Sequence, residues 1–200
     1  VTSPHEELLA VTEVALQGGV EIVQYRDKET PDEQRFANAI ALKKLCDRYH
    51  ALFLVNDRVD LALAVDADGV HLGQTDLPIA TARQLIGPDK IIGRSTTNPQ
   101  ELEKALREGA DYVGVGPVYE TPTKPGKAAA GHSYVSYARE TCPVPWFAIG
   151  SIDTENLGEV LAAGAERVAV VRALMQSAEP TLTAQFFAAQ LHRQQTLQNL

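Results

Sequence analysis

The sequence predicts an α/β fold arranged as a (β/α)8 barrel, and two patterns support this prediction. Short apolar runs alternate with helical segments along the 200 residues, which is the order of strands and helices in a parallel sheet. The runs are short, and no GxGxxG turn follows any of them. A closed eight-fold barrel is therefore favoured over an open doubly wound sheet, although periodicity alone allows both.

Seven strands are expected from the apolar runs. Their approximate ranges are 21–25, 52–55, 69–72, 91–94, 111–115, 145–149 and 166–171. Val1 and Thr2, directly before the first helix start, look like the last residues of an eighth strand, at the start of the chain. We therefore expect residues 1–200 to form a single barrel domain whose first strand is truncated.

A repeated start signal predicts the helices between these strands. It consists of a capping residue, Pro at the first helical position and an acid soon afterwards. The signal occurs at Ser3–Glu6, Thr30–Glu33 and Asn98–Glu101, with a weaker version at Asp153–Asn156. A further helical segment covers about 59–65. Short polar loops are thus expected to join each strand to its helix.

The composition limits what the chain can bind and where it can work. A net charge of -8 argues against nucleic acid and anionic membranes as partners, since both attract surplus Lys and Arg. No apolar run approaches the length of about 18 residues that a membrane span needs, and no secretory leader is visible. Cys46 and Cys142 have neither zinc nor disulfide spacing. We therefore expect a soluble cytoplasmic protein that holds any anion in a local cluster.

Asp57 and Asp76 occupy equivalent positions after two consecutive predicted strands. The run 52–55 breaks into Asn56 and Asp57, and the run 69–72 breaks into a polar turn that ends at Asp76. The carboxyl ends of parallel strands lie at one rim, so these carboxylates can converge there on a hard cation such as Mg2+. The alternative is that both are turn and capping residues, where Asp is favoured regardless of chemistry.

The end of the first complete strand, Gln24-Tyr25-Arg26-Asp27-Lys28, offers donors for a polyphosphate. Alternation along an extended chain sends Gln24, Arg26 and Lys28 to one side. Arg can bind phosphate oxygens through two parallel hydrogen bonds, whereas Lys acts as a point charge. The alternative is an exposed strand end that contacts only water.

A second group of residues follows the later strands, and its hydroxyls and backbone N–H groups could bind a single phosphate with Arg172 nearby, while the Lys124 ammonium addresses a second anion. Its members are Thr121, Pro122, Thr123, Lys124, Gly150, Ser151 and Arg172. The first four lie in the long connection 116–133, which is rich in Pro and Gly and is expected to act as a lid. Ordinary turns containing Pro or Gly are the alternative for these segments.

Two residues of the middle strands have different expected roles. His71 is better explained as a hydrogen-bonded barrel residue than as a catalytic base. Ser95 follows the strand near 91–94 and has no obvious structural duty. The histidines show no HxxxH or HExxH spacing, and no Ser-His-Asp or Cys-His arrangement is visible, so hydrolysis through a covalent intermediate is not favoured.

Five ordered motifs make the chain resemble the thiamine-phosphate synthase family along nearly its whole length. They are QYRDK, VNDRVDLALAVDADGVHLGQTDLP, GRST, GADYVGVGPVYETPTKPG and FAIGSID. Members of that family are (β/α)8 TIM barrels that act in thiamine biosynthesis with Mg2+. They join 4-amino-2-methyl-5-hydroxymethylpyrimidine diphosphate to 4-methyl-5-(2-hydroxyethyl)thiazole phosphate, giving thiamine phosphate and pyrophosphate. The resemblance therefore implies a Mg-dependent transferase.

The resemblance also implies a role for each candidate residue. The pyrimidine diphosphate would be bound by Gln24, Tyr25, Arg26, Asp27, Lys28, Asn56, Ser95 and Lys124. The thiazole phosphate would be bound by Thr121, Pro122, Thr123, Gly150, Ser151, Val171 and Arg172. Mg2+ would be bound by Asp57 and Asp76. Catalysis would involve Arg26, Ser95 and Lys124.

The implied reaction suits this set of residues. The nucleophile is a ring nitrogen with a lone pair and no proton, so a general base is not needed. The difficult step is the departure of pyrophosphate, whose growing charge a metal ion and cations can stabilise. Because an aminopyrimidine can stabilise a developing carbocation, a dissociative path is expected.

Two positions depart from the family pattern, and both lie on the thiazole-phosphate side. The family usually has Gly where this chain has Ser151, and often Ser where it has Arg172. Ser151 can still offer its backbone N–H if its φ is negative, and Arg172 could compensate through its side chain. Two alternatives stay open: a thiazole tautomerase-like isomerase, which would not need the diphosphate residues, and a non-catalytic phosphate-binding barrel, which would lack the metal site.

Overall fold

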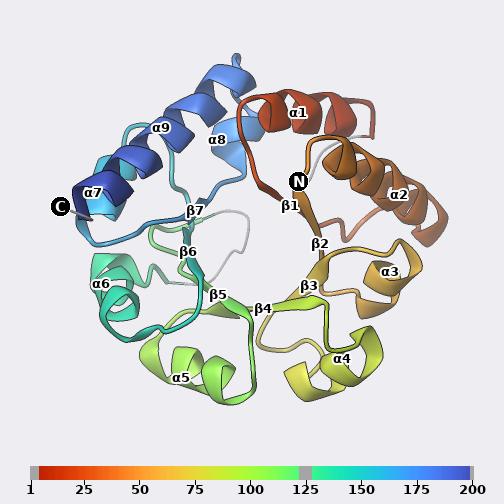
Figure 1. Cartoon of the computed structure of the whole chain (residues 1–200), viewed down its shortest axis with the longest axis horizontal. Coiled ribbons are helices and arrows are strands. Elements are labelled where there is room, and N and C mark those ends of the chain that lie inside the picture. Colours follow the sequence, from red (N-terminus) through yellow and green to blue (C-terminus); the bar gives the residue numbers. More distant parts are fainter. Residues whose placement is uncertain (1–4, 122–127, 199–200) are drawn as a thin grey trace.

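The computed structural model describes residues 5–121 and 128–198, and in this part of the chain seven parallel strands form one curled sheet (Figure 1). The strands are β1 (Ile22–Tyr25), β2 (Leu52–Asn56), β3 (Gly69–Leu72), β4 (Ile91–Thr96), β5 (Tyr112–Val115), β6 (Trp146–Ile149) and β7 (Val168–Ala169). They pair in chain order from β1 to β7. Their carboxyl ends therefore all lie at the same rim of the sheet.

Helices surround this curled sheet on its outer side (Figure 1). They are α1 (His5–Gln17), α2 (Asp32–Arg48), α3 (Val59–Ala64), α4 (Ile79–Ile86), α5 (Pro99–Arg107), α6 (Gly131–Thr141), α7 (Leu157–Ala162), α8 (Arg172–Met175) and α9 (Pro180–Gln198). Within the described ranges, no helix combines the length and the apolar character needed to cross a bilayer.

The seven predicted strands all occur, each within two residues of its expected bounds. The expected alternation of strands and helices is therefore confirmed. The described part of the sheet is nevertheless open, because β1 and β7 are its two edges and do not pair with each other. Val1, Thr2 and the first helix start at Ser3 and Pro4 lie outside the described residues.

The predicted helix starts differ in how well they match the structure. Asn98 caps α5 as expected, with its Oδ1 accepting a hydrogen bond of 2.9 Å from the N–H of Glu101. The expected cap by Thr30 is wrong, because α2 begins only after Pro31. The Thr30 N–H instead donates to Oδ1 of Asp27 at 3.0 Å, so the Asp27 carboxylate closes the turn before this helix.

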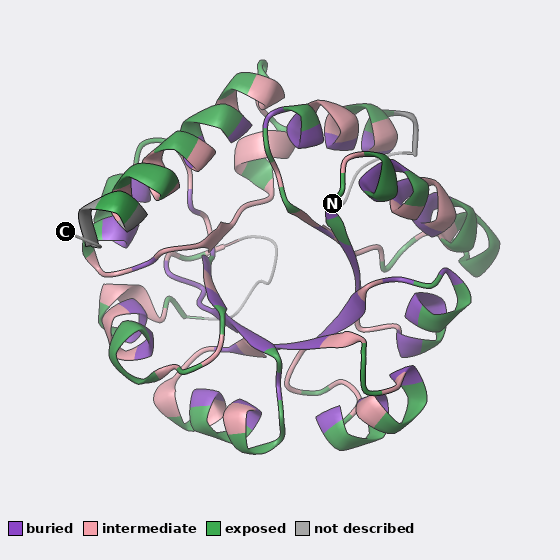
Figure 2. Cartoon of the chain, in the orientation of Figure 1, coloured by how far each residue is buried: buried purple, intermediate pink, exposed green. Residues whose placement is uncertain are grey.

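The outward face of the sheet packs against the helices and forms the core. Its residues include Phe53, Val55, Val70, Ile92 and Val113, all of them fully buried. Burying one such aliphatic or aromatic side chain contributes about 1.5–3 kcal/mol, so this layer is the main source of stability. Figure 2 shows the contrast along the sheet: β3 and β5 are buried along their whole length, whereas β1 and β7 are partly exposed.

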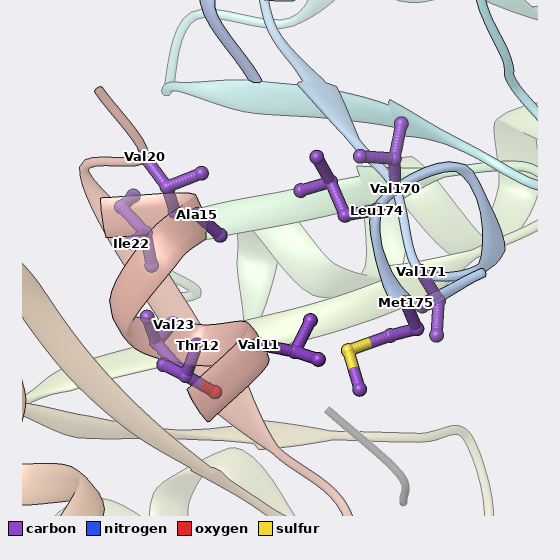
Figure 3. A pocket seen from close by; sticks show the side chains of 10 residues that line it. All are labelled: Val11, Thr12, Ala15, Val20, Ile22, Val23, Val170, Val171, Leu174 and Met175. Carbon is purple, nitrogen blue, oxygen red and sulfur yellow. The ribbon is translucent and has the colours of Figure 1, made fainter. Parts of the chain in front are cut away.

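An apolar pocket lies at the opening of the sheet, between β1 and the segment after β7 (Figure 3). Its lining is aliphatic apart from one threonine and one methionine: Val11, Thr12, Ala15, Val20, Ile22, Val23, Val170, Val171, Leu174 and Met175. On the outer side of the opening, α1 packs against α9, and Oγ1 of Thr181 donates to the carbonyl of Val14 at 2.9 Å. The helix layer is thus continuous where the strand layer is open.

Candidate functional site

Asp57 and Asp76, which follow β2 and β3, lie side by side at the carboxyl rim and are hydrogen-bonded to each other. The backbone fixes both positions. The N–H of Asp57 donates to the carbonyl of His71 at 2.8 Å, and the N–H of Gly73 donates to Oδ2 of Asp76 at 2.6 Å. Asp57 has a φ of +63°. This left-handed conformation costs about 1–2 kcal/mol for a residue with a side chain, and such strain is common at functional sites.

The two carboxyl groups have pKa values that are shifted in opposite directions. Burial alone would raise the pKa of Asp57, but the hydrogen bonds from Asp76 and Lys28 and the charges of Lys28 and Arg26 outweigh it, so this pKa is lowered. Burial and the hydrogen bond to Asp57 raise the pKa of Asp76, and the Gly73 N–H offsets part of this effect. The pair therefore carries one firmly ionised carboxylate beside one that retains its proton more readily.

This donor set fits a Mg2+ ion that is shared with a phosphate ligand. Within residues 5–121 and 128–198, the side chains of His, Cys, Asp and Glu form no group of three or more that could hold a metal on its own. Mg2+ typically uses one or two carboxylates and completes its shell with waters and phosphate oxygens. Two converging carboxyl groups meet that requirement.

Two basic residues from the end of β1 reach the acidic pair. Nζ of Lys28 lies 2.8 Å from Oδ2 of Asp57, and the charge of Arg26 acts on the same carboxylate. The Lys28 side chain is 57% exposed, so it can also contact a ligand at the rim. Gln24, earlier on the same strand, hydrogen-bonds to Tyr112 in the sheet interior. The structure thus places cations and acids at one rim, where a diphosphate and its metal ion could bind.

Tyr25 and Asp27, also expected near the diphosphate, have structural contacts instead. Tyr25 is buried on the helix side of the sheet, and its hydroxyl donates to Oδ2 of Asp27 at 3.0 Å and accepts from Nδ2 of Asn38. The Asp27 carboxylate also accepts the Thr30 N–H. Although burial opposes the shift, these hydrogen bonds lower the pKa of Asp27 to about 2. Direct binding of substrate by these two residues stays a prediction.

The interior face of the sheet carries a chain of hydrogen bonds between β3, β4 and β5. Nδ1 of His71 lies 2.7 Å from the Tyr112 hydroxyl, and Nε2 of His71 lies 2.8 Å from Oγ of Ser95. The expectation that His71 is a hydrogen-bonded strand residue is confirmed. Ser95 does have a structural contact, contrary to expectation. Sequence reasoning also missed Tyr112 and Gln74, whose Nε2 donates to the Ser95 carbonyl at 2.7 Å.

The turn after β6 is built by unusual backbone conformations. Gly150 has a φ of +117°, and a Cβ atom there would lie 2.5 Å from Cα of Pro117, so only glycine fits. Ser151 has a φ of +48°. The condition under which Ser151 was expected to offer its backbone N–H, a negative φ, is therefore not met. Oγ of Ser151 donates to the Glu120 carbonyl at 2.7 Å and accepts from Nη2 of Arg172 at 2.8 Å.

The remaining residues expected at the thiazole-phosphate side are only partly described. Val171 directly precedes α8, and Thr121 is half-buried after β5. Pro122, Thr123 and Lys124 lie outside the described residues, and with them the centre of the expected lid 116–133. In the described part, the structure therefore brings Arg172 to Ser151 and so joins the strand ends of β6 and β7.

The family model described as thiamine monophosphate synthase matches residues 1–174. The chain belongs to this family. The five motifs noted in the sequence lie within these residues, and each contains the carboxyl end of a strand. Asp57, Asp76 and the residues after β6 all lie in these motifs.

Individual thiamine monophosphate synthase relatives give the same assignment. The chain is 67% identical to a thiamine-phosphate synthase of Synechocystis sp. over 96% of this chain and 56% of the relative. It is 65% identical to a thiamine-phosphate synthase of Nostoc sp., again over 96% of this chain and 55% of the relative. The chain thus spans about half the length of these curated relatives.

A solved structure supports the fold of this thiamine monophosphate synthase family member. The thiamine phosphate pyrophosphorylase of Pyrococcus furiosus superposes with a TM-score of 0.87 at 35% sequence identity. The match covers 96% of this chain and 94% of that chain. The curled sheet and its ring of helices therefore correspond to a complete, separately solved chain of similar extent.

Proposed function

We propose that this chain carries a thiamine-phosphate synthase activity. It would transfer the pyrimidinylmethyl group of 4-amino-2-methyl-5-hydroxymethylpyrimidine diphosphate to the ring nitrogen of 4-methyl-5-(2-hydroxyethyl)thiazole phosphate. The observation that carries this proposal is the Asp57–Asp76 pair beside Lys28 and Arg26, because it joins a two-carboxylate metal site to cations at one rim.

Asp57 and Asp76 would hold Mg2+, which supplies charge neutralisation at the diphosphate when it is bound. In the reaction, the bond between the methylene carbon and the diphosphate oxygen breaks, and pyrophosphate leaves with the electron pair. The thiazole nitrogen then forms the new C–N bond. Arg26 and Lys28 would bind the oxygens on which negative charge grows, so their contribution is larger in the transition state than in the ground state.

The thiazole phosphate would bind at the turn after β6. Arg172 offers its guanidinium there, and Gly150 allows the backbone to approach a ligand closely. In the proposal, Thr121, Pro122 and Thr123 complete this second anion site, while Lys124 joins the diphosphate site. Two separate anion sites at one rim match two phosphorylated substrates.

Two other assignments fit these observations less well. A thiazole tautomerase-like isomerase binds one phosphate and has no use for two carboxylates placed against Arg26 and Lys28. A non-catalytic phosphate-binding barrel has no reason to maintain a strained Asp57 beside a second acid. Neither therefore accounts for the acidic pair.

The proposal extends to the fold and to the compartment. We take the curled sheet as part of a (β/α)8 TIM barrel with one strand position between β7 and β1 that the described residues do not fill, because an apolar pocket and two strand edges unpaired within those residues adjoin that opening. A place in the cytoplasm suits a biosynthetic enzyme whose Cys46 and Cys142 are both free thiols.

The direct test mixes both phosphorylated substrates with the protein and Mg2+ and measures thiamine phosphate and pyrophosphate. We expect equal amounts of the two products, and neither when Mg2+ is removed by a chelator. Omitting the thiazole phosphate is the control for simple hydrolysis of the diphosphate. Failure to form thiamine phosphate with both substrates present would overturn the proposal, and isomerisation of the thiazole alone would favour the tautomerase.

A further inference from the structure

We propose that Tyr112 and His71 are positioning residues that make the Ser95 hydroxyl a hydrogen-bond donor toward the bound pyrimidine diphosphate. This inference rests on the proposed function, since the substrate that accepts the Ser95 hydrogen bond is the pyrimidine diphosphate of that function. The observation that carries it is the chain of hydrogen bonds from Gln24 through Tyr112 and His71 to Ser95.

The register of the strands brings the residues of this hydrogen-bond chain together. His71 on β3 pairs with Gly93 on β4, and Gly93 pairs with Tyr112 on β5, so the three residues lie in one row on the interior face. A Cβ atom on Gly93 would lie 2.1 Å from the Tyr112 ring and 2.5 Å from its hydroxyl oxygen. The absence of a side chain at Gly93 therefore lets Tyr112 reach across β4 to His71.

The Tyr112 ring is held firmly in that place. Tyr112 and His71 are both buried, and Phe147 packs edge-on against the Tyr112 ring with the ring centres 5.6 Å apart. Buried polar groups stabilise a protein only when they are paired, so each hydrogen bond of the chain constrains the next one.

The proposal assigns a donor and an acceptor to each hydrogen bond, starting with Gln24. Burial raises the pKa of the Tyr112 hydroxyl far above its ordinary value, so the phenol keeps its proton. The phenol oxygen contacts both Gln24 and Nδ1 of His71, and in the proposal the Gln24 amide donates to it. The single proton of the Tyr112 hydroxyl is then available for Nδ1 of His71, which accepts it.

The state of Ser95 follows from that of His71. A neutral imidazole that accepts at Nδ1 carries its proton on Nε2, so this nitrogen donates to Oγ of Ser95. The Ser95 hydroxyl therefore accepts from His71 and directs its own proton elsewhere. Ser95 is half-buried at the end of β4, so a phosphate or ring acceptor of the diphosphate substrate can receive that proton.

The proton positions can be tested without any substrate. Nitrogen NMR of the 15N-labelled protein distinguishes a protonated ring nitrogen from a bare one, and His71→Gln identifies the His71 signals by their loss. We expect a proton on Nε2 and a bare Nδ1. A proton on Nδ1 would overturn the proposal, whether Nε2 is bare or protonated.

The positioning role is tested by a double-mutant cycle on kcat/KM for the pyrimidine diphosphate. Tyr112→Phe is expected to lower this value about tenfold in the native background and by less than about twofold when Ser95→Ala is already present. Equal losses in the two backgrounds would show that Tyr112 does not act through Ser95, and would overturn the proposal.

Tyr134→Phe is the matched control. The Tyr134 hydroxyl is also buried and donates to Oγ1 of Thr96 at 2.7 Å. Thr96 is the residue after Ser95 on β4, and its side chain lies on the helix side of the sheet. We expect Tyr134→Phe to change kcat/KM by less than about twofold, so a large loss would indicate general disturbance of β4 and count against the proposal. If the native chain forms no thiamine phosphate, the proposed function fails, while the NMR measurement still decides the hydrogen-bond direction.

Discussion

The two halves of the carboxyl rim are built in different ways. On the side of β1 to β4, the charged side chains follow the strands, and Asp57, itself in a left-handed conformation, contacts both Lys28 and Asp76. On the side of β6 and β7 the strands are shorter or more exposed, and β7 has only two residues. There two consecutive residues, Gly150 and Ser151, have left-handed conformations, and Arg172 is the cation beside them.

This difference separates two means of binding an anion. The first half depends on the charge of its side chains, so it should respond most to substitutions that change charge while keeping shape. If the proposed function holds, the second half depends on backbone conformation and on Arg172, so it should respond most to substitutions that change the allowed φ. Substitutions of each kind can confirm or break the division.

The largest effect is expected from the acids. Asp57→Asn and Asp76→Asn should each lower kcat by about a hundredfold, because the amide keeps the shape but loses the charge that would hold Mg2+ at the leaving group. Steady-state kinetics at limiting Mg2+ measure this loss. Asp60→Asn, an exposed acid paired with Arg58, is the control and should leave kcat unchanged. Near-native activity in both site variants would remove the metal assignment.

The next effect is a backbone one. Gly150→Ala should lower the free energy of unfolding by more than about 1 kcal/mol and raise the KM for the thiazole phosphate, since both φ and the contact with Pro117 oppose a side chain. Thermal denaturation and kinetics measure the two changes. Gly158→Ala in α7, where a Cβ meets nothing within 4 Å, should instead leave the KM unchanged and stabilise the helix slightly. An unchanged KM in Gly150→Ala would mean that the turn does not contact the phosphate.

Arg172 tests the single cation of the second half. Arg172→Ser should raise the KM for the thiazole phosphate about tenfold, because a hydrogen bond to a charged group contributes about 1.5–3 kcal/mol. Arg167→Ser is the control, since the Arg167 side chain lies next to Glu166 before β7 and outside the proposed site. Equal KM values in the two variants would leave phosphate binding to the backbone alone.

The smallest effect concerns stability and pH. A carboxyl whose pKa is raised on folding stabilises the protein below its unfolded pKa of about 3.9, and this contribution is lost as the pH rises through the raised value. Ionised Asp76 therefore destabilises the metal-free protein at neutral pH. Asp76→Asn should raise the metal-free Tm at pH 7 by a few degrees at most and abolish any increase produced by Mg2+. A lower Tm in this variant would contradict the pKa direction.

The same division explains what could be predicted from the sequence. The strands and the convergence of Asp57 and Asp76 follow from a pattern that repeats along the chain, because parallel strands place their ends together. The contact of His71 with Tyr112 depends on strand register and on the missing side chain of Gly93, which no local pattern expresses. The positive φ of Ser151 runs against the usual preference of serine, so the sequence could state a negative φ only as a condition.

Within the described sheet, β1 and β7 are the two edges, and no ladder of backbone hydrogen bonds joins them directly. The ladder fixes the spacing of neighbouring strands. At the two edges, β1 leads to Arg26 and Lys28, and β7 leads to Arg172. Between these two edges, the direct connection is the packing of α1 against α9. Within the described residues, these two groups of cations are therefore linked by the ladder only the long way round, through all seven strands, whereas the short path between them runs through the side-chain packing of α1 on α9.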